Sequence, residues 1–227
     1  MKRKTLLLAG WGMHSDVWRP LIERLDAQID PVLLEWNGAV RSDPPELPGV
    51  ECAIGWSLGA MKLIEWIAQR RIAPSRLILL SCGASMACRD DVPGVHPRIL
   101  QRMRKKLSGE KAAVLDDFFK NVLYPSNDTN ATKPLLERAV QFPVADLEVG
   151  LDYLINVDLR TSLDAITMPA LMLHGDQDRI LPVEAGEWLQ KQIPQAQWSI
   201  LAGQGHALPL SAADEAARQI QKFLEHG

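Results

Sequence analysis

Short apolar runs alternate along this chain with longer stretches in which apolar residues recur every three or four positions. Runs of five or six apolar residues are typical of buried strands, and the recurring pattern is typical of amphipathic helices. The predicted strands cover residues 4–9, 32–36, 50–54, 76–81, 169–174 and 196–201, and the predicted helices cover residues 16–26, 58–71, 182–192 and 211–225. This alternation predicts an α/β fold, with a mostly parallel sheet flanked by helices.

One connection is expected to be short. Residues 37–49 contain three prolines and two glycines, and this composition disfavours a helix. A parallel crossover normally contains a helix. We therefore expect a shortened connection, without a helix, before the strand at residues 50–54.

A second departure is an insertion. Residues 85–164 contain no sheet-like run, and their pattern predicts helices at 98–107, 110–123, 133–142 and 144–155. Long connections of this kind often carry function, and some of them close over a site. We expect residues 85–164 to form a helical cap, or lid, on a core made of residues 1–84 and 165–227.

The turn after the strand at 50–54 has the sequence Gly55-Trp56-Ser57-Leu58-Gly59. A serine on a tight turn between a strand and a helix has strained backbone angles and a hydroxyl that stands clear of the sheet. The helix that follows directs free N–H groups at any anion that forms there. Gly-x-Ser-x-Gly alone is a common pattern, and an isolated match can be a simple turn. The flanking strand and helix favour Ser57 as a nucleophile.

A nucleophilic serine needs a base and an acid that orients the base. Asp176 and Asp178 follow the strand at 169–174, and His206 follows the strand at 196–201. Ligands collect at these carboxyl ends in parallel sheets. Asp178 is favoured over Asp176 because it stands three residues after a glycine and four before a proline, the usual pattern for the acid.

Other histidines compete with His206 for the role of base. His226 is in the terminal tail, His96 is in the expected cap, and His174 ends a strand, which is more typical of the core or of a position behind a site. His14 follows the first strand and could line the site. Only His206 combines a glycine-flanked loop, a late strand before it and a helix after it.

Composition limits the class of protein. The 227 residues are 47% hydrophobic, enough for one sizeable core, and the net charge of −3 gives no general attraction to nucleic acid or anionic membranes. Three scattered cysteines suit a reducing compartment. The apolar run at residues 5–10 is too short for a secretion signal or a membrane span. We expect a cytoplasmic monomer with no metal site and no cofactor.

Several motifs together resemble the pimeloyl-[acyl-carrier-protein] methyl ester esterases of biotin synthesis, which are α/β-hydrolases with a helical cap. These motifs are Gly10-Trp11-Gly12, Gly55-Trp56-Ser57-Leu58-Gly59, Arg89-Asp90-Asp91-Val92-Pro93-Gly94, Val157-Asp158-Leu159-Arg160 and Gly205-His206-Ala207. The resemblance covers nearly the whole chain. It implies a Ser57–His206–Asp178 triad, an oxyanion hole made by the main-chain N–H groups of Trp11 and Leu58, and hydrolysis of a methyl ester on a carrier-bound acyl chain.

The chain departs from the resemblance before Trp11. Many relatives have His-Gly where this chain has Ala9-Gly10, so the oxyanion hole could differ in shape. Trp11 could also be an ordinary core or surface aromatic residue.

Two other functions remain open. A general short-chain carboxylesterase or lactonase would use the same triad. A ligand-binding protein could use the hydrolase pocket without turnover, although it would not need all three triad residues.

A basic run supports the carrier-bound substrate. Residues 98–120 contain seven basic and three acidic side chains, a net charge of +4 in a chain of net charge −3. Acyl carrier proteins are strongly acidic, so Arg98, Arg102, Lys105 and Lys106 are candidates for carrier docking. The alternative is that these side chains form an ordinary solvated helix face.

Overall fold

Six strands form one parallel sheet in the order β2-β1-β3-β4-β5-β6. The protein is described here by a computed structural model, which covers residues 2–126 and 129–225. The strands are β1 (Arg3–Leu8), β2 (Ile29–Leu34), β3 (Cys52–Trp56), β4 (Arg76–Leu80), β5 (Ala170–Gly175) and β6 (Ala196–Leu201). Because all of them run in the same direction, their carboxyl ends meet at one edge of the sheet.

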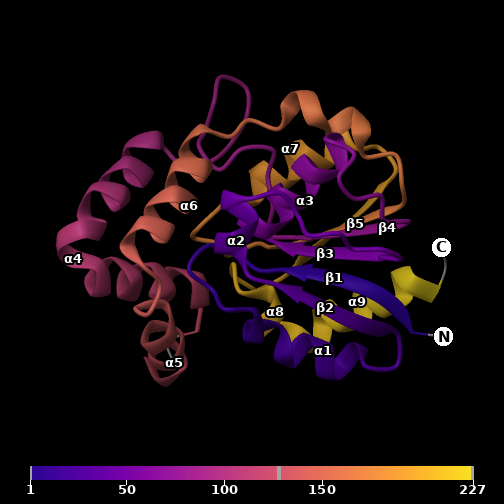
Figure 1. Cartoon of the computed structure of the whole chain (residues 1–227), viewed down its shortest axis with the longest axis horizontal. Coiled ribbons are helices and arrows are strands. Elements are labelled where there is room, and N and C mark those ends of the chain that lie inside the picture. The colour runs from indigo at the N-terminus through magenta and orange to yellow at the C-terminus, as the bar shows by residue number, and fades with distance from the viewer. Residues whose placement is uncertain (1, 127–128, 226–227) are drawn as a thin grey trace.

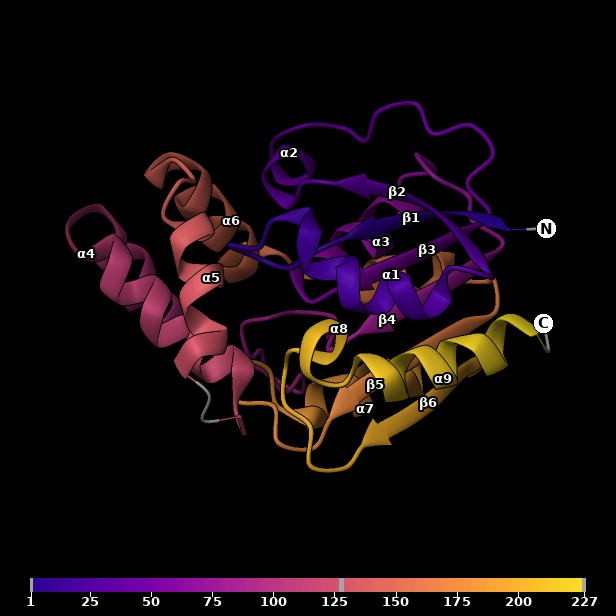
Figure 2. The ribbon, with the colours of Figure 1, turned by 90° about the horizontal axis from the view of Figure 1, so that it is seen from below.

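Helices cover both faces of this sheet. Helices α3 (Leu58–Ala68) and α7 (Val183–Gln192) lie on one face, and α1 (Arg19–Leu25), α8 (Leu208–Ser211) and α9 (Ala213–Glu225) lie on the other (Figures 1 and 2). A 3₁₀ turn, η1 (Ser15–Trp18), precedes α1, and another, η2 (Arg160–Ala165), precedes β5. With helices on both faces, every residue of the central strands β3 and β5 is buried, which explains their continuous apolar runs.

The predicted α/β architecture is confirmed, with one wrong detail. Helix α2 (Trp36–Arg41) lies in the segment for which we expected no helix. All three prolines of that segment come after Arg41, so the residues before them are free to form a helix. Gly38 is tolerated inside α2, which is only six residues long. The connection is therefore short, but it contains a helix.

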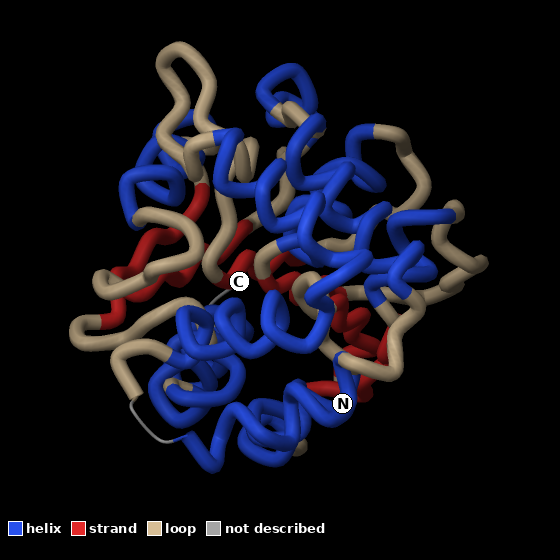
Figure 3. Tube along the Cα trace, turned by 90° about the vertical axis from the view of Figure 1, so that its left-hand side faces the viewer, coloured by secondary structure: helices blue, strands red, loops and turns tan. Residues whose placement is uncertain are grey.

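In its described residues, 85–126 and 129–164, the inserted segment contains three α-helices, α4 (Pro97–Leu123), α5 (Thr129–Ala139) and α6 (Val144–Asn156), between β4 and β5. They stand at the carboxyl-terminal edge of the sheet (Figure 1), and Figure 3 shows them in front of the strands. The two helices predicted at 98–107 and 110–123 are one element, α4, with non-helical backbone angles at Glu110. The expected break is thus present as a kink.

Helix α6 packs directly on the sheet edge because one of its residues has no side chain. A Cβ added at Gly150 would lie 2.5 Å from ring atoms of both Trp11 and Trp36. The indole N–H of Trp11 also donates to the main-chain oxygen of Leu147, at 2.9 Å. Tyr153 adds a polar contact, since its hydroxyl donates to Glu65 of α3 at 3.1 Å.

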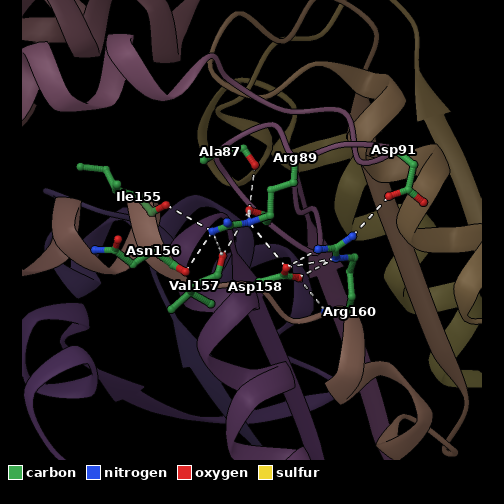
Figure 4. A network of polar contacts seen from close by, with 9 residues as sticks. Ala87, Arg89, Asp91, Ile155, Asn156, Val157, Asp158 and Arg160 are labelled. Atoms are coloured by element: carbon green, nitrogen blue, oxygen red, sulfur yellow. Dashed lines mark hydrogen bonds and ion pairs between the residues drawn. The ribbon is translucent and has the colours of Figure 1, made fainter.

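A cluster of charged side chains joins the two points where the chain passes between the core and the inserted helices (Figure 4). Nη2 of Arg89 donates to the main-chain oxygens of Ile155, Asn156 and Val157, at 2.9–3.3 Å. Arg160 pairs with Asp158 at 2.7 Å and with Asp91 at 3.3 Å. The last carbonyls of a helix have no partner within the helix, so Arg89 closes the end of α6 from the other crossing.

Candidate active site

Ser57 occupies the turn between β3 and α3 in a conformation that non-glycine residues rarely adopt, with φ 56° and ψ −121°. Its main-chain N–H donates to the oxygen of Leu80 on the neighbouring strand, at 2.9 Å. The strained turn is therefore anchored to the sheet and places Ser57 at the carboxyl end of β3.

The glycines on either side of Ser57 allow α3 to pass close to the sheet. A Cβ added at Gly59 would lie 2.0 Å from the main-chain oxygen of Leu8, and one added at Gly55 would lie 2.4 Å from the Cα of Ala60. Real Cβ atoms do not approach backbone so closely. Both glycines are therefore required for the close packing of α3 on the sheet.

Asp178 and His206 meet in the interior. Nδ1 of His206 is 2.7 Å from Oδ2 of Asp178, and both side chains are almost wholly buried. The other carboxylate oxygen, Oδ1, accepts the main-chain N–H groups of Ile180 and Leu181, at 2.8 and 2.9 Å. The structure thus joins Asp178 to His206. Asp176 lies on the surface and accepts the N–H of Gly203 at 2.7 Å.

The surroundings keep Asp178 ionised. Burial on its own raises the pKa of this carboxyl group. The charge of His206 and hydrogen bonds from His174 and His206 outweigh that effect and hold the pKa of Asp178 well below its ordinary range. A permanently negative group beside the imidazole fixes its hydrogen on Nδ1 and leaves Nε2 for other partners.

The main chain of His206 is tied to the serine turn. Its carbonyl oxygen accepts the indole N–H of Trp56 at 2.9 Å and the hydroxyl of Ser81 at 3.1 Å. Trp56 is the residue directly before Ser57, so the histidine loop and the serine turn are held against each other. Residue patterns give no sign of this contact.

Trp11 and Leu58 also lie near Ser57. Leu58 is the first residue of α3, where main-chain N–H groups have no acceptor within the helix. Trp11 follows Gly10, and a Cβ added at Gly10 would lie only 3.2 Å from the Cβ of Ser57. The loop after β1 therefore runs against the serine. The ring of Trp11 points under the inserted helices and meets Phe118 edge to face, with centroids 4.9 Å apart.

A cavity of about 580 Å³ lies between the inserted helices and the core. Its lining is mostly apolar and includes Trp11, Met86, Leu100, Met103, Leu154 and Ile180. Ser57 and His206 are not among the lining residues. The cavity instead adjoins the site through Trp11, which runs beside Ser57, and through Ile180, which donates to Asp178. Its charged lining residues are of both signs: Arg102, Lys106, Arg179, Glu110 and Asp117.

The basic side chains of α4 differ in their surroundings. Arg98, Arg102 and Lys105 are exposed and lie on one face of the helix, since they are four and three residues apart. Lys106 is half-buried and pairs with Glu110 at 2.8 Å. Two others hold the inserted segment together: Arg104 pairs with Asp152 and Glu148, and Lys111 donates to the main-chain oxygens of Val140 and Phe142. Lys120 pairs with Asp116 within α4 itself.

Of the other described histidines, two lie away from the Asp178–His206 pair and the third contacts Asp178. His14 stacks on Phe142, with ring centroids 4.2 Å apart, and His96 accepts the main-chain N–H of Arg98 at the start of α4. His174 is buried behind Asp178. His226 lies outside the described residues.

Comparison with known proteins gives the family. Residues 5–219 match the model of the alpha/beta hydrolase family. The chain belongs to this family. It is 31% identical to the pimeloyl-[acyl-carrier protein] methyl ester esterase of Nitrosomonas europaea, over 92% of this chain and 91% of that protein. It is 27% identical to the esterase of the same name from Yersinia pseudotuberculosis, over 97% of this chain and 92% of that one.

The fold of this alpha/beta hydrolase also matches solved structures. The bromoperoxidase of Bacillus anthracis superposes with a TM-score of 0.89 at 18% identity, over 99% of this chain and 92% of that one. The family resemblance expected from the motifs is confirmed, and these relatives are consistent with a carboxylic ester hydrolase. Among residues 2–126 and 129–225, no helix is long and apolar enough to cross a bilayer, and no group of three His, Cys, Asp or Glu side chains could hold a metal ion.

The packing of the serine turn leads to a test of stability. Gly59→Ala places a methyl group against the backbone of β1, so we expect the free energy of unfolding to fall by about 3 kcal/mol, measured by urea denaturation. Gly109→Ala is the matched control, because a Cβ there has nothing within 4 Å. A Gly59→Ala protein as stable as the Gly109→Ala protein would contradict the close approach.

Proposed function

We propose that this alpha/beta hydrolase is a serine carboxylesterase that hydrolyses the methyl ester of a carrier-bound acyl chain, in the class of pimeloyl-[acyl-carrier protein] methyl esters. The observation that carries the proposal is the buried Asp178–His206 pair, 2.7 Å apart, tied through Trp56 to the strained Ser57 turn. The names of the relatives support the substrate. With the motif resemblance to the esterases of biotin synthesis, we propose the same role, in the cytoplasm, for this chain.

In the proposed mechanism the Ser57 hydroxyl attacks the ester carbonyl and gives its proton to Nε2 of His206. The negative charge that forms on the carbonyl oxygen is held by the main-chain N–H groups of Trp11 and Leu58. Collapse of this intermediate breaks the bond to the methoxy group, which takes the proton from His206 and leaves as methanol. Water, deprotonated by His206, then attacks the acyl-serine. As this second intermediate collapses, His206 returns the proton to the Ser57 oxygen, and the carboxylic acid and the free serine are released.

Asp178 assists both halves of the reaction. Its carboxylate accepts Nδ1–H of His206 and so presents the lone pair of Nε2 to the serine. When His206 is protonated, the buried negative charge stabilises the imidazolium. Because the pKa of Asp178 is held well below its ordinary range, this assistance is available at every pH at which the imidazole is neutral.

The inserted helices supply the proposed substrate site. The apolar cavity between α4, α6 and the core suits an acyl chain. Arg98, Arg102 and Lys105 form an exposed basic face at the amino-terminal end of α4, and Arg102 also lines the cavity. An acidic carrier on this face would deliver its acyl chain to the cavity. Lys106 is expected to contribute less, because Glu110 already neutralises it.

A general short-chain carboxylesterase or lactonase is the second candidate. The same triad would hydrolyse small esters, and the cavity is apolar enough to hold them. The two candidates differ in whether the basic face contributes to turnover. The purified protein should therefore be offered both a pimeloyl-carrier methyl ester and p-nitrophenyl esters, and the values of kcat/KM compared.

Ser57→Ala removes the proposed nucleophile. We expect ester hydrolysis and labelling by a fluorophosphonate probe to disappear, because only an activated serine reacts with such a probe. Circular dichroism and thermal unfolding should remain near wild type, since alanine fits the turn. Turnover near the wild-type rate would rule out Ser57, and failure of the wild-type protein to label would favour a binding protein without turnover.

Asp178→Asn tests the acid. The change presents the wrong hydrogen-bonding partner to Nδ1 of His206, so kcat should fall by about 10⁴, as for the equivalent residue of serine proteases. Asp176→Asn is the matched control, because Asp176 is exposed and its carboxylate accepts the main-chain N–H of Gly203 on the neighbouring loop. It should keep kcat within a few-fold of wild type. The opposite ranking of the two variants would transfer the role to Asp176.

Charge reversal tests the carrier face. In the double variant Arg98→Glu and Lys105→Glu, which changes no residue of the cavity lining, KM for the carrier-linked ester should rise about tenfold at low salt and approach the wild-type value at high salt, because exposed charges are screened over about 10 Å at 0.1 M. Hydrolysis of p-nitrophenyl esters should be unchanged.

The control for that variant is Arg19→Glu with Lys191→Glu, which reverses two exposed charges on α1 and α7. A rise in KM equal to that of the control would make the basic run an ordinary solvated face and favour the general esterase. An equal loss on both substrates would mean that the inserted helices, not a docking face, had been damaged.

A further inference from the structure

His174, at the end of β5, is a buried polar residue that the proposed mechanism does not use. Its side chain is fully buried. Nε2 lies 3.0 Å from the main-chain oxygen of Leu181 and 3.2 Å from Oδ2 of Asp178. Within the described residues, Nδ1 has no hydrogen-bond partner. The other positions of β5 from Ala170 to Leu173 are apolar, so the histidine departs from the pattern of its strand.

These contacts fix which nitrogen carries the hydrogen. A buried N–H without an acceptor is costly, and no acceptor faces Nδ1. The hydrogen therefore belongs on Nε2, where two oxygens receive it. The ring cannot turn away easily, because α7 packs against it. A Cβ added at Gly186 would lie 2.6 Å from Nδ1 of His174, and the ring of Trp198 lies 6.1 Å away, centroid to centroid.

Four hydrogen-bond donors therefore face the Asp178 carboxylate. Its Oδ1 atom accepts two main-chain N–H groups, from Ile180 and Leu181. Its Oδ2 atom faces two imidazoles at once, His206 at 2.7 Å and His174 at 3.2 Å. The main-chain donors fix the position of the carboxylate. The two imidazoles then share one oxygen, so the bond to His206 depends on how much of that oxygen His174 takes.

We infer that His174 is a positioning residue for the proposed reaction, acting through Asp178. Its Nε2–H holds Oδ2 in line with Nδ1 of His206 and withdraws negative charge from that oxygen. The inference rests on the proposed function, since it assigns His174 a role behind the Asp178–His206 pair. His174 touches neither the serine nor the substrate cavity. Its effect should therefore appear in kcat and not in KM.

Three substitutions separate the hydrogen bond from the packing. In His174→Gln the side-chain N–H₂ can reach the place of Nε2, whereas in His174→Asn it reaches only the place of Nδ1. His174→Leu has no donor. We expect kcat for a p-nitrophenyl ester to fall about tenfold or more in the Leu and Asn variants. A loss of this size is typical when a hydrogen-bond partner that orients a metal-ligating histidine is removed. KM should be unchanged, and the Gln variant should stay within about threefold of wild type.

A proton NMR spectrum gives a second readout that does not need turnover. The hydrogen between Nδ1 of His206 and Asp178 should give a strongly downfield resonance. Without the competing donor, Oδ2 should bind this hydrogen more tightly, so the resonance should move further downfield in His174→Leu and return in His174→Gln. A shift caused by loosened packing would instead appear also in Trp198→Phe, which leaves every donor to Asp178 in place.

The inference is overturned if His174→Leu keeps kcat within twofold of wild type, or if Leu, Asn and Gln lose activity equally, since only the ring would then matter. An unchanged resonance in the Leu variant would overturn it as well. Its failure is distinguishable from that of the proposed function. If Ser57→Ala and Asp178→Asn lose activity and His174→Leu does not, only the role of His174 is ruled out. If Ser57→Ala stays active, the proposed nucleophile is ruled out.

Discussion

The close approach of α3 to the sheet is the constraint on which the rest of the site depends. The first turn of α3 can lie against β1 only because Gly59 has no Cβ, and Gly55 permits the same approach to β3. This contact holds Ser57 in its strained conformation and directs the start of the helix at the carboxyl edge of the sheet. Asp178 and His206 reach the same edge because β5 and β6 run parallel to β3. A parallel sheet thus gathers residues that lie 149 positions apart, from 57 to 206.

Much of this arrangement could be predicted from the sequence, because central strands buried on both faces leave continuous apolar runs such as Leu171–Leu173. The turns around Ser57, Asp178 and His206 carry glycines and prolines at fixed distances, so these residues could also be identified from the sequence as candidates for the site. Local composition is less reliable at α2, because prolines that follow a helix do not prevent the helix from forming. Charge was least informative: counting basic residues on α4 did not separate exposed Arg102 from Arg104, which binds Asp152 and Glu148.

Contacts between distant segments lay beyond sequence reasoning altogether. Trp56 binds the carbonyl of His206, and Arg89 closes the end of α6, yet neither pair is marked by spacing or periodicity. His174 illustrates the same limit in the core. From the sequence it is one histidine at the end of an apolar strand, and only the folded chain shows that its ring lies beside Asp178. Polar residues that interrupt an apolar pattern are therefore useful places to look for such contacts.

Trp11 links two parts of the molecule in a way that has a thermodynamic consequence. Its main chain follows Gly10, which lies against Ser57. Its indole N–H donates a hydrogen bond to the main-chain oxygen of Leu147, and the ring faces Gly150 on α6. A displacement of α6 therefore perturbs the backbone beside the serine. By linkage the coupling must act in both directions: whatever binds beside Ser57 and favours one position of Trp11 also favours one position of the inserted helices. A ligand on the outer face of those helices and a ligand beside the serine would then change each other's affinity by the same factor.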